Sequence, residues 1–248
     1  MKQNRQQNNN QPIIVGVGSS AGGLEAFGIL LESLQDATGL ALVYIQHLDP
    51  ASKAVLLELL TKYTSLEVTE LGDRTKLISG KIYVCPPQGL LEIRNGVVTL
   101  ADSEINPHPS HAIDHFFHSL AEDQGERAVG VILSGAGSDG TLGLKAISDS
   151  GGLTFAQDSK SAKYDSMPRS AATTGVADHV LPPGDIAREL IQYVEHLHKL
   201  NTSASLTRFQ DQITDAIPQI TAILQKKTGH NFQHYKTSTL SRRIQRRM

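Results

Sequence analysis

The stretch Ile13-Ile14-Val15-Gly16-Val17-Gly18-Ser19-Ser20-Ala21-Gly22-Gly23-Leu24 decides the fold. Its apolar run, residues 13–17, predicts a buried strand, and the glycines that follow predict a tight turn. Residues 24–34 then place apolar side chains three or four positions apart, as an amphipathic helix does. A strand that passes through such a turn directly into a helix aims the first helical amides, and the positive end of the helix dipole, at whatever lies above the turn.

Apolar runs and helical segments continue to alternate along the chain. Further strands are predicted at residues 41–45, 81–85, 128–133 and 153–156, and further helices at residues 54–63, 112–121, 142–150 and 185–200. This alternation predicts an α/β fold with a doubly wound, mostly parallel sheet. Asn95-Gly96 suits a type I′ turn between two short apolar runs, so we expect an antiparallel hairpin at one edge of the sheet.

The polar and apolar composition divides the chain into four parts. We expect a disordered polar N-terminus at residues 1–11, one α/β domain at 12–200, a linker at 201–206 and a small helical segment at 207–248. The N-terminus lacks the apolar core of a signal peptide, and no later run reaches the roughly 18 apolar residues that a membrane span needs. We therefore expect a cytoplasmic protein without membrane insertion.

Charge and cysteine content exclude several function classes. The chain has 25 acidic and 23 basic side chains, so no overall field favours nucleic acid or an anionic membrane. The single cysteine, Cys85, excludes an internal disulfide and any multi-cysteine zinc site. Because Cys85 closes an apolar strand, we interpret it as a core residue, not as a thiol nucleophile.

The glycine-rich turn fits two chemistries. It can project a serine, Ser19 or Ser20, over the sheet edge beside amides that hold an oxyanion. It also matches the dinucleotide fingerprint from Gly16 to Ala21, although the next strand ends in Gln46-His47 where that fingerprint expects an acidic residue. A purely structural turn is the third interpretation. The turn alone leaves all three open.

A serine nucleophile needs a base and an orienting acid. His47 follows the strand at 41–45, and Asp139 follows the strand at 128–133. The ends of parallel strands share one edge of a sheet, so Ser20, His47 and Asp139 can converge. The alternatives are that His47 is a surface loop histidine and that Asp139 is a helix N-cap.

Several short motifs follow one another along the chain. They are Gly18-Ser19-Ser20-Ala21-Gly22-Gly23, Gln46-His47, Gly130-Val131-Ile132-Leu133-Ser134-Gly135, Ser138-Asp139-Gly140 and Met167-Pro168-Arg169, together with Pro109-Ser110, Asp114 and Ala156-Gln157. Their order and type resemble those of CheB methylesterase catalytic domains, and the resemblance extends from about Pro12 to Leu197.

The resemblance implies a role for each site residue. Ser20 is then the nucleophile, His47 the general base and acid, and Asp139 the orienting carboxylate of a Ser-His-Asp triad. The backbone amides of Ala21 and Ala136 are the implied oxyanion donors. The family often has methionine where this chain has Ala136, a change that keeps the amide donor.

The resemblance also implies the reaction. We expect hydrolysis of glutamate 5-O-methyl esters on methyl-accepting chemotaxis receptors with release of methanol, and deamidation of receptor glutamines, without metal or cofactor. A non-catalytic receptor-docking module is the rival function. Because the chain has eleven polar residues where the common family form has a receiver domain, we expect no control by its own receiver.

Two further features stand outside this site. Phe232, Tyr235-Lys236, Thr239-Leu240 and the arginine-rich residues 242–248 resemble the start of a CheR methyltransferase. These residues could form only the start of such a unit, without the part that would bind S-adenosylmethionine. We therefore expect a fusion to a methyltransferase domain beyond residue 248 and predict no methyl transfer by residues 1–248. His108, His111, His115 and His118 crowd one segment, but the apolar residues between them indicate core packing and not a zinc site.

Overall fold

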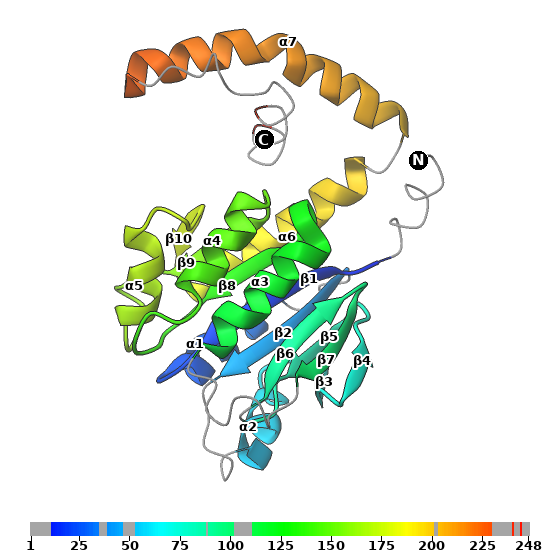
Figure 1. Ribbon diagram of the computed structural model, residues 1–248, viewed down its shortest axis with the longest axis vertical. Helices are drawn as coiled ribbons and strands as arrows, with labels where there is room; N and C mark the ends of the chain where they lie inside the picture. Colours follow the sequence, from blue (N-terminus) through cyan, green and yellow to red (C-terminus); the bar gives the residue numbers. More distant parts are fainter. Residues whose placement is uncertain are drawn as a thin grey trace. The chain divides into compact units, whose positions relative to one another are not determined.

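The computed structural model describes residues 11–34, 39–46, 53–87, 89–101, 111–200, 203–229, 240 and 244. It contains two compact units, Met1–Val194 and Glu195–Met248. The first unit holds every strand of the described residues and the predicted site (Figure 1). None of the described helices combines the length and apolar character that crossing a bilayer requires.

A seven-stranded sheet forms the centre of the first unit, in the order β10-β9-β8-β1-β2-β5-β3. All its neighbouring strands pair in parallel. The strands are β1 (Ile13–Ser19), β2 (Leu40–Gln46), β3 (Glu67–Glu70), β5 (Lys81–Val84), β8 (Val129–Ile132), β9 (Leu153–Gln157) and β10 (His179–Leu181). Every strand therefore points its carboxyl end at the same edge, which is where ligand and catalytic sites of such sheets lie.

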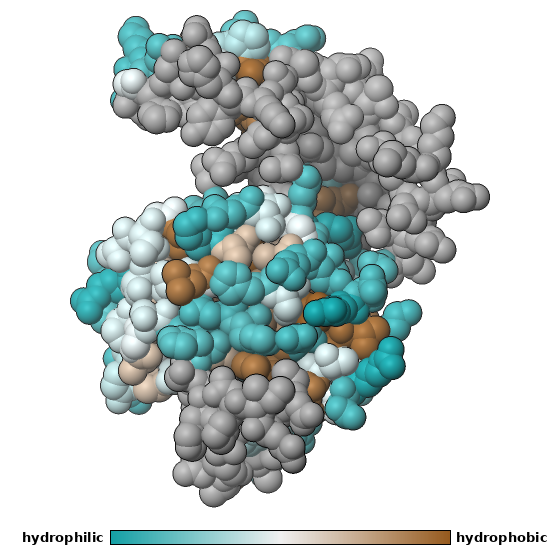
Figure 2. Space-filling view, viewed as in Figure 1, coloured by the Kyte–Doolittle hydropathy of each residue, from teal (hydrophilic) through white to brown (hydrophobic). Residues whose placement is uncertain are grey.

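Helices cover both faces of this sheet (Figure 1). They are α1 (Gly23–Leu34), α2 (Lys53–Leu60), α3 (Ala112–Gln124), α4 (Thr141–Asp149), α5 (Ser166–Thr173) and α6 (Pro183–Leu200), with a 3₁₀ turn at Gly125–Arg127. Helices α3, α4 and α5 share one buried cluster on one face. Their outer surface is mainly hydrophilic with scattered hydrophobic residues, as a solvated face should be (Figure 2).

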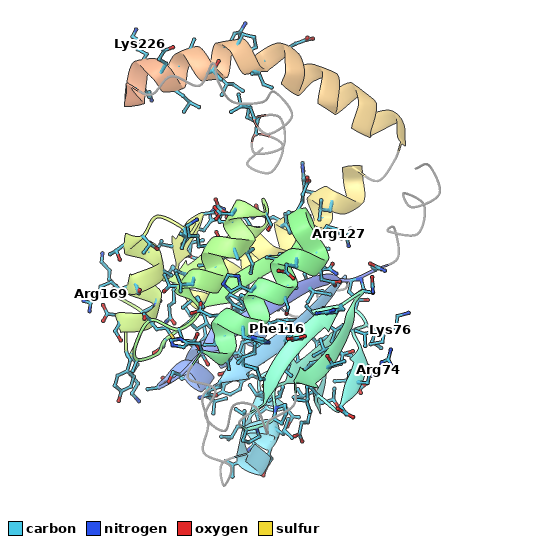
Figure 3. The ribbon with its side chains drawn as sticks, in the orientation of Figure 1. Arg74, Lys76, Phe116, Arg127, Arg169 and Lys226 are labelled. Carbon is cyan, nitrogen blue, oxygen red and sulfur yellow. The ribbon has the colours of Figure 1, made fainter. Side chains whose placement is uncertain are left out.

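The two faces of β1 carry different side chains because strand residues alternate. Ile14, Gly16 and Gly18 face α3. A Cβ built on Gly16 would lie 2.6 Å from Cε1 of Phe117, and one on Gly18 would lie 2.4 Å from Cγ2 of Ile113. These glycines therefore let α3 approach the sheet closely, and α3 also directs Phe116 toward the strands (Figure 3).

A second sheet packs beside α3. It contains β4 (Arg74–Lys76), β7 (Val97–Ala101) and β6 (Leu90–Arg94), all antiparallel. The hairpin β6–β7 turns at Asn95 and Gly96, whose φ angles are +52° and +71°, as a type I′ turn requires. The Asp123 carboxylate of α3 accepts the amides of both turn residues.

The predicted fold class is confirmed, and most predicted elements lie within a few residues of their expected ends. The hairpin also forms where it was expected, although it belongs to the separate three-stranded sheet. Unpredicted elements are the short strands β3, β4 and β10 and the helix α5, which contains Pro168. These elements are short and carry few apolar side chains, so no hydrophobic period marks them. In the second unit, α7 (Ser203–Thr228) begins inside the stretch expected to be a linker.

We expect Gly18→Ala to reduce the free energy of unfolding by about 1–3 kcal/mol, because its new methyl group would overlap Ile113. Urea denaturation followed by circular dichroism measures this loss. Gly72→Ala is the matched control, since the nearest atom to its added Cβ is Oγ1 of Thr75 at 3.8 Å. Equal stability of the two variants would contradict the close approach of α3.

Candidate active site

The two serines of the turn have different surroundings. Ser19 is fully buried, and its hydroxyl donates to the Tyr44 hydroxyl at 2.7 Å. Ser20, the next residue, follows the end of β1 and is partly exposed. Burial also raises the pKa of Tyr44, so this phenol stays neutral in its hydrogen bonds. Ser20 is therefore accessible to a molecule from outside, whereas Ser19 is not.

The turn at Ser20 is tied to the loop that follows β8. The Ser20 amide donates to the Ser134 carbonyl at 3.0 Å, and the Ser134 hydroxyl donates to the Ala21 carbonyl at 2.9 Å. The side-chain oxygen of Gln157, at the end of β9, accepts the Ser134 amide at 2.8 Å. Three adjacent strand ends therefore hold the two loops together.

Gly135 lies directly against Ser20. A Cβ built on Gly135 would be 3.0 Å from Cβ of Ser20 and 2.6 Å from Cε of Met167. The Gly135 amide donates to the Tyr164 carbonyl at 2.9 Å. This glycine therefore lets the loop after β8, including Ala136, pass close to the Ser20 side chain.

Two amides near Ser20 are available for a ligand. Within the part of the chain that the structure describes, the amides of Ala21 and Ala136 make no hydrogen bond. Such amides beside a reachable hydroxyl are the groups from which an oxyanion hole is built.

Asp139 lies in the loop between β8 and α4 and is buried beside the first turn of α3. Its carboxylate accepts the Ile113 amide at 3.0 Å, the Asp114 amide at 3.0 Å and the Gly140 amide at 2.8 Å. These bonds fix the carboxylate beside the first turn of α3, where the helix dipole favours negative charge. The alternative of an N-cap is thus partly right, because Asp139 binds first-turn amides of a helix that is distant in the sequence.

His47 lies outside the described residues, so its position relative to Ser20 and Asp139 stays a prediction. The residue before it, Gln46, ends β2 and pairs in register with Ser19. The Gln46 side-chain amide donates to the Ser20 carbonyl at 3.3 Å. The chain therefore leaves β2 beside the turn that carries Ser20.

A second carboxylate, Asp114, lies near Asp139. It is 8% exposed, and its Oδ1 accepts the Gly143 amide at 2.7 Å. Burial raises the pKa of Asp114, the Gly143 amide opposes this rise, and the neighbouring charge of Asp139 adds to it. Asp114 therefore carries a cost when it ionises in the folded protein.

The three described histidines of the crowded set, His111, His115 and His118, do not gather at one point. His108 lies outside the described residues, His115 lies 3.2 Å from the Glu92 carboxylate, and His118 is exposed. Among the described residues one group has metal-ligand types within 4.8 Å of one another, namely His111, Asp114 and Asp139. Backbone amides already bind both carboxylates, which accounts for this arrangement without an ion.

The surroundings of Gly16, Gly18 and Cys85 disfavour a dinucleotide site and a thiol nucleophile. Gly16 and Gly18 of the dinucleotide fingerprint lie inside β1 and face α3, so they serve helix packing and not a pyrophosphate. Cys85 is buried, and burial raises the pKa of its thiol to about 12. Because the thiolate is the reactive form, Cys85 is unsuited to nucleophilic catalysis near neutral pH.

The motif Met167-Pro168-Arg169 has no structural role that the sequence alone predicts. Met167 is buried at the start of α5 beside Gly135, whereas Arg169 lies on the outside of α5, 3.4 Å from the Asp165 carboxylate (Figure 3). The sequence indicates no role for Tyr44, which bonds the side chains of Ser19 and Gln46, or for Ser166, which bonds the loop after β8. No spacing or period marks such residues, because their roles depend on contacts between distant segments.

Comparison with known proteins matches two regions of the chain to two families. Residues 15–190 match the family model described as CheB methylesterase, and residues 215–248 match the all-alpha domain of CheR methyltransferase. The crystal structure of the Thermotoga maritima CheB methylesterase catalytic domain matches with a TM-score of 0.67 and 30% identity, covering 73% of this chain and 98% of that one.

Curated relatives agree with these matches. The chain is 36% identical over 180 residues to protein-glutamate methylesterase/protein-glutamine glutaminase 1 of Pseudomonas fluorescens, covering 72% of this chain and 54% of the relative. It is 34% identical over 185 residues to a putative protein of the same description from Leptospira interrogans, covering 74% of this chain and 95% of the relative. The chain thus spans about half the length of the Pseudomonas relative.

We expect Asp114→Asn to become more stable relative to the unchanged protein as pH rises. An unfolded aspartate ionises near pH 3.9, whereas the pKa of folded Asp114 is raised, so between these values the folded protein holds the extra proton and loses stability as pH increases. Asparagine avoids this loss and can still accept the Gly143 amide. Urea denaturation of both proteins from pH 3.5 to 8 measures the difference, and a difference that is independent of pH would contradict the prediction.

Proposed function

This chain belongs to the CheB methylesterase family, and on that premise we propose that it hydrolyses glutamate 5-O-methyl esters on methyl-accepting chemotaxis receptors. The observation that carries the proposal is the partly exposed Ser20, held beside two unpaired amides among the described residues. The buried and hydrogen-bonded Ser19 favours Ser20 as the attacking group.

The reaction follows from the chemistry of a serine ester hydrolase. The Ser20 hydroxyl attacks the ester carbonyl of the methylated glutamate while His47 takes its proton. The tetrahedral intermediate collapses, and methanol leaves with the proton from His47. Water then attacks the acyl-enzyme, again losing a proton to His47, and the products are the glutamate carboxylate and free Ser20. No metal or cofactor takes part in these steps.

Asp139 has the supporting role in this scheme. An orienting carboxylate holds the imidazole in one tautomer and stabilises the imidazolium that forms. The amides that bind both oxygens of Asp139 support this role, because they hold the carboxylate in one orientation. The amides of Ala21 and Ala136 would bind the oxyanion. These donors are backbone groups, so the residue types at positions 21 and 136 do not reveal them.

The two matched families support a fusion. We assign residues 12–200 to the methylesterase domain and residues 207–248 to the start of a methyltransferase unit, in line with the separate matches of the two regions. Because the implied substrate is the helical cytoplasmic part of a receptor, we propose that the chain acts in the cytoplasm.

We expect Ser20→Ala to lower methanol release from a methyl-esterified receptor fragment by about 10³-fold or more, because it removes the nucleophile. Gas chromatography of released methanol measures the rate. Ser33→Ala is the control, since among the described residues the Ser33 hydroxyl bonds only the Ile29 carbonyl of its own helix. A folded Ser20→Ala variant with full activity would remove Ser20 from the mechanism.

The same chemistry should deamidate receptor glutamines, since the Pseudomonas relative is named for both activities. Attack of Ser20 on the glutamine carbonyl would release ammonia in place of methanol and form the same acyl-enzyme. We expect Ser20→Ala to lose ammonia release and methanol release together, as measured by an ammonia assay and by the mass of the receptor peptide. Retention of either activity alone would show that two different sites carry them.

A further inference from the structure

Each of the two oxyanion amides belongs to a peptide group whose carbonyl oxygen accepts two hydrogen bonds. In a trans peptide group the C=O and the N–H of the next residue point in opposite directions, so fixing the carbonyl also fixes the amide. The Ala21 amide shares its peptide group with the Ser20 carbonyl. The Ala136 amide shares its group with the Gly135 carbonyl.

The Ser20 carbonyl accepts two hydrogen bonds. The Gly23 amide donates to it at 3.0 Å, and the side-chain amide of Gln46 donates at 3.3 Å. Gln46 comes from β2, whereas Ser20 follows β1, so this bond joins two different strand ends. The plane of the 20–21 peptide group is thereby held from outside its own turn.

Gln46 is itself oriented by a buried pair. The Tyr44 hydroxyl donates to its Oε1 at 2.9 Å, and the Ser19 hydroxyl donates to Tyr44 at 2.7 Å. Tyr44 cannot rotate away, because its fully buried ring stacks on Phe27 with ring centroids 4.1 Å apart. With its oxygen bonded to Tyr44, the Gln46 side chain presents its NH₂ group to the Ser20 carbonyl.

The Gly135 carbonyl is held in a similar way. It accepts the Met167 amide at 3.1 Å and the Ser166 hydroxyl at 3.2 Å. The Ser166 oxygen also accepts the Gly137 amide at 3.2 Å. Ser166 therefore bonds to the loop on both sides of Ala136, using its one hydrogen and one lone pair.

We propose that Gln46 and Ser166 are positioning residues that aim the Ala21 and Ala136 amides at the oxyanion. This inference rests on the proposed esterase function. Neither side chain needs to touch the substrate, because each acts through the carbonyl of the peptide group that carries the donor. The two supports come from β2 and α5, elements that bring no nucleophile to the reaction.

The expected kinetic effect follows from the value of an oxyanion donor. Loss of one donor commonly lowers kcat by about 10²–10³-fold. A misaimed amide retains part of this effect, so we expect a loss of about 10–10²-fold in kcat for each positioning residue. KM should change little, because the donors bind the tetrahedral intermediate more strongly than the planar ester.

The test uses conservative substitutions in the intact chain. Gln46→Glu keeps the acceptor for Tyr44 but replaces the donor that faces the Ser20 carbonyl. Ser166→Ala removes the hydroxyl, and Ser166→Thr restores it as the matched control. The measurements are kcat and KM for the methyl ester, the affinity for a methyl boronic acid that forms a tetrahedral adduct with Ser20, and the thermal midpoint of unfolding.

We expect Gln46→Glu and Ser166→Ala to lose kcat and boronic acid affinity by similar factors, with KM and the thermal midpoint nearly unchanged, and Ser166→Thr to recover. Should Gln46→Glu fail to fold, Gln46→Met tests the same bond without adding a charge. Unchanged kcat, a loss confined to KM, or Ser166→Thr no better than Ser166→Ala would overturn the inference. If the unchanged chain is folded but hydrolyses no ester, the proposed function itself fails, which is a different result.

Discussion

The hydrogen bond from the Ser20 amide to the Ser134 carbonyl is the constraint on which the rest of the site depends. It continues the parallel pairing of β1 and β8 beyond the last residues of both strands. One loop carries the reachable hydroxyl, and the other carries the Ala136 amide and leads to Asp139. Since parallel strands end at one edge, hydrogen bonds between their loops bring together side chains from positions more than a hundred residues apart.

Much of the fold follows from local features of the sequence. The apolar runs of β1, β2, β8 and β9 and the Asn95-Gly96 turn marked their elements because burial and positive φ angles select residue types directly. Short edge strands such as β3 carry no such signal, since their side chains are half exposed. The separation of the hairpin into its own sheet was also hidden, because strand period does not say which neighbour a strand pairs with.

The site was predictable only in part. Strand ends identified Ser20, His47 and Asp139 as groups that can converge, but composition and spacing could not choose Ser20 over Ser19. In the structure, the two serines differ in accessibility, because Ser19 is buried and hydrogen-bonded to Tyr44. Supports such as Ser166 depend on contacts between loops distant in sequence, and a family resemblance did not assign them either. Backbone donors are harder still to recognise, because any residue supplies the same amide.

Helix α3 makes hydrogen bonds to a different part of the fold at each end. Its first turn binds the Asp139 carboxylate, and near its last turn Asp123 binds the amides of the Asn95-Gly96 hairpin turn. The Ser119 hydroxyl between them accepts the Ile93 amide of β6. Fraying this helix would therefore release the small sheet and the buried carboxylate together. Because α3 binds both, we expect the small sheet and the carboxylate site to open as one cooperative unit.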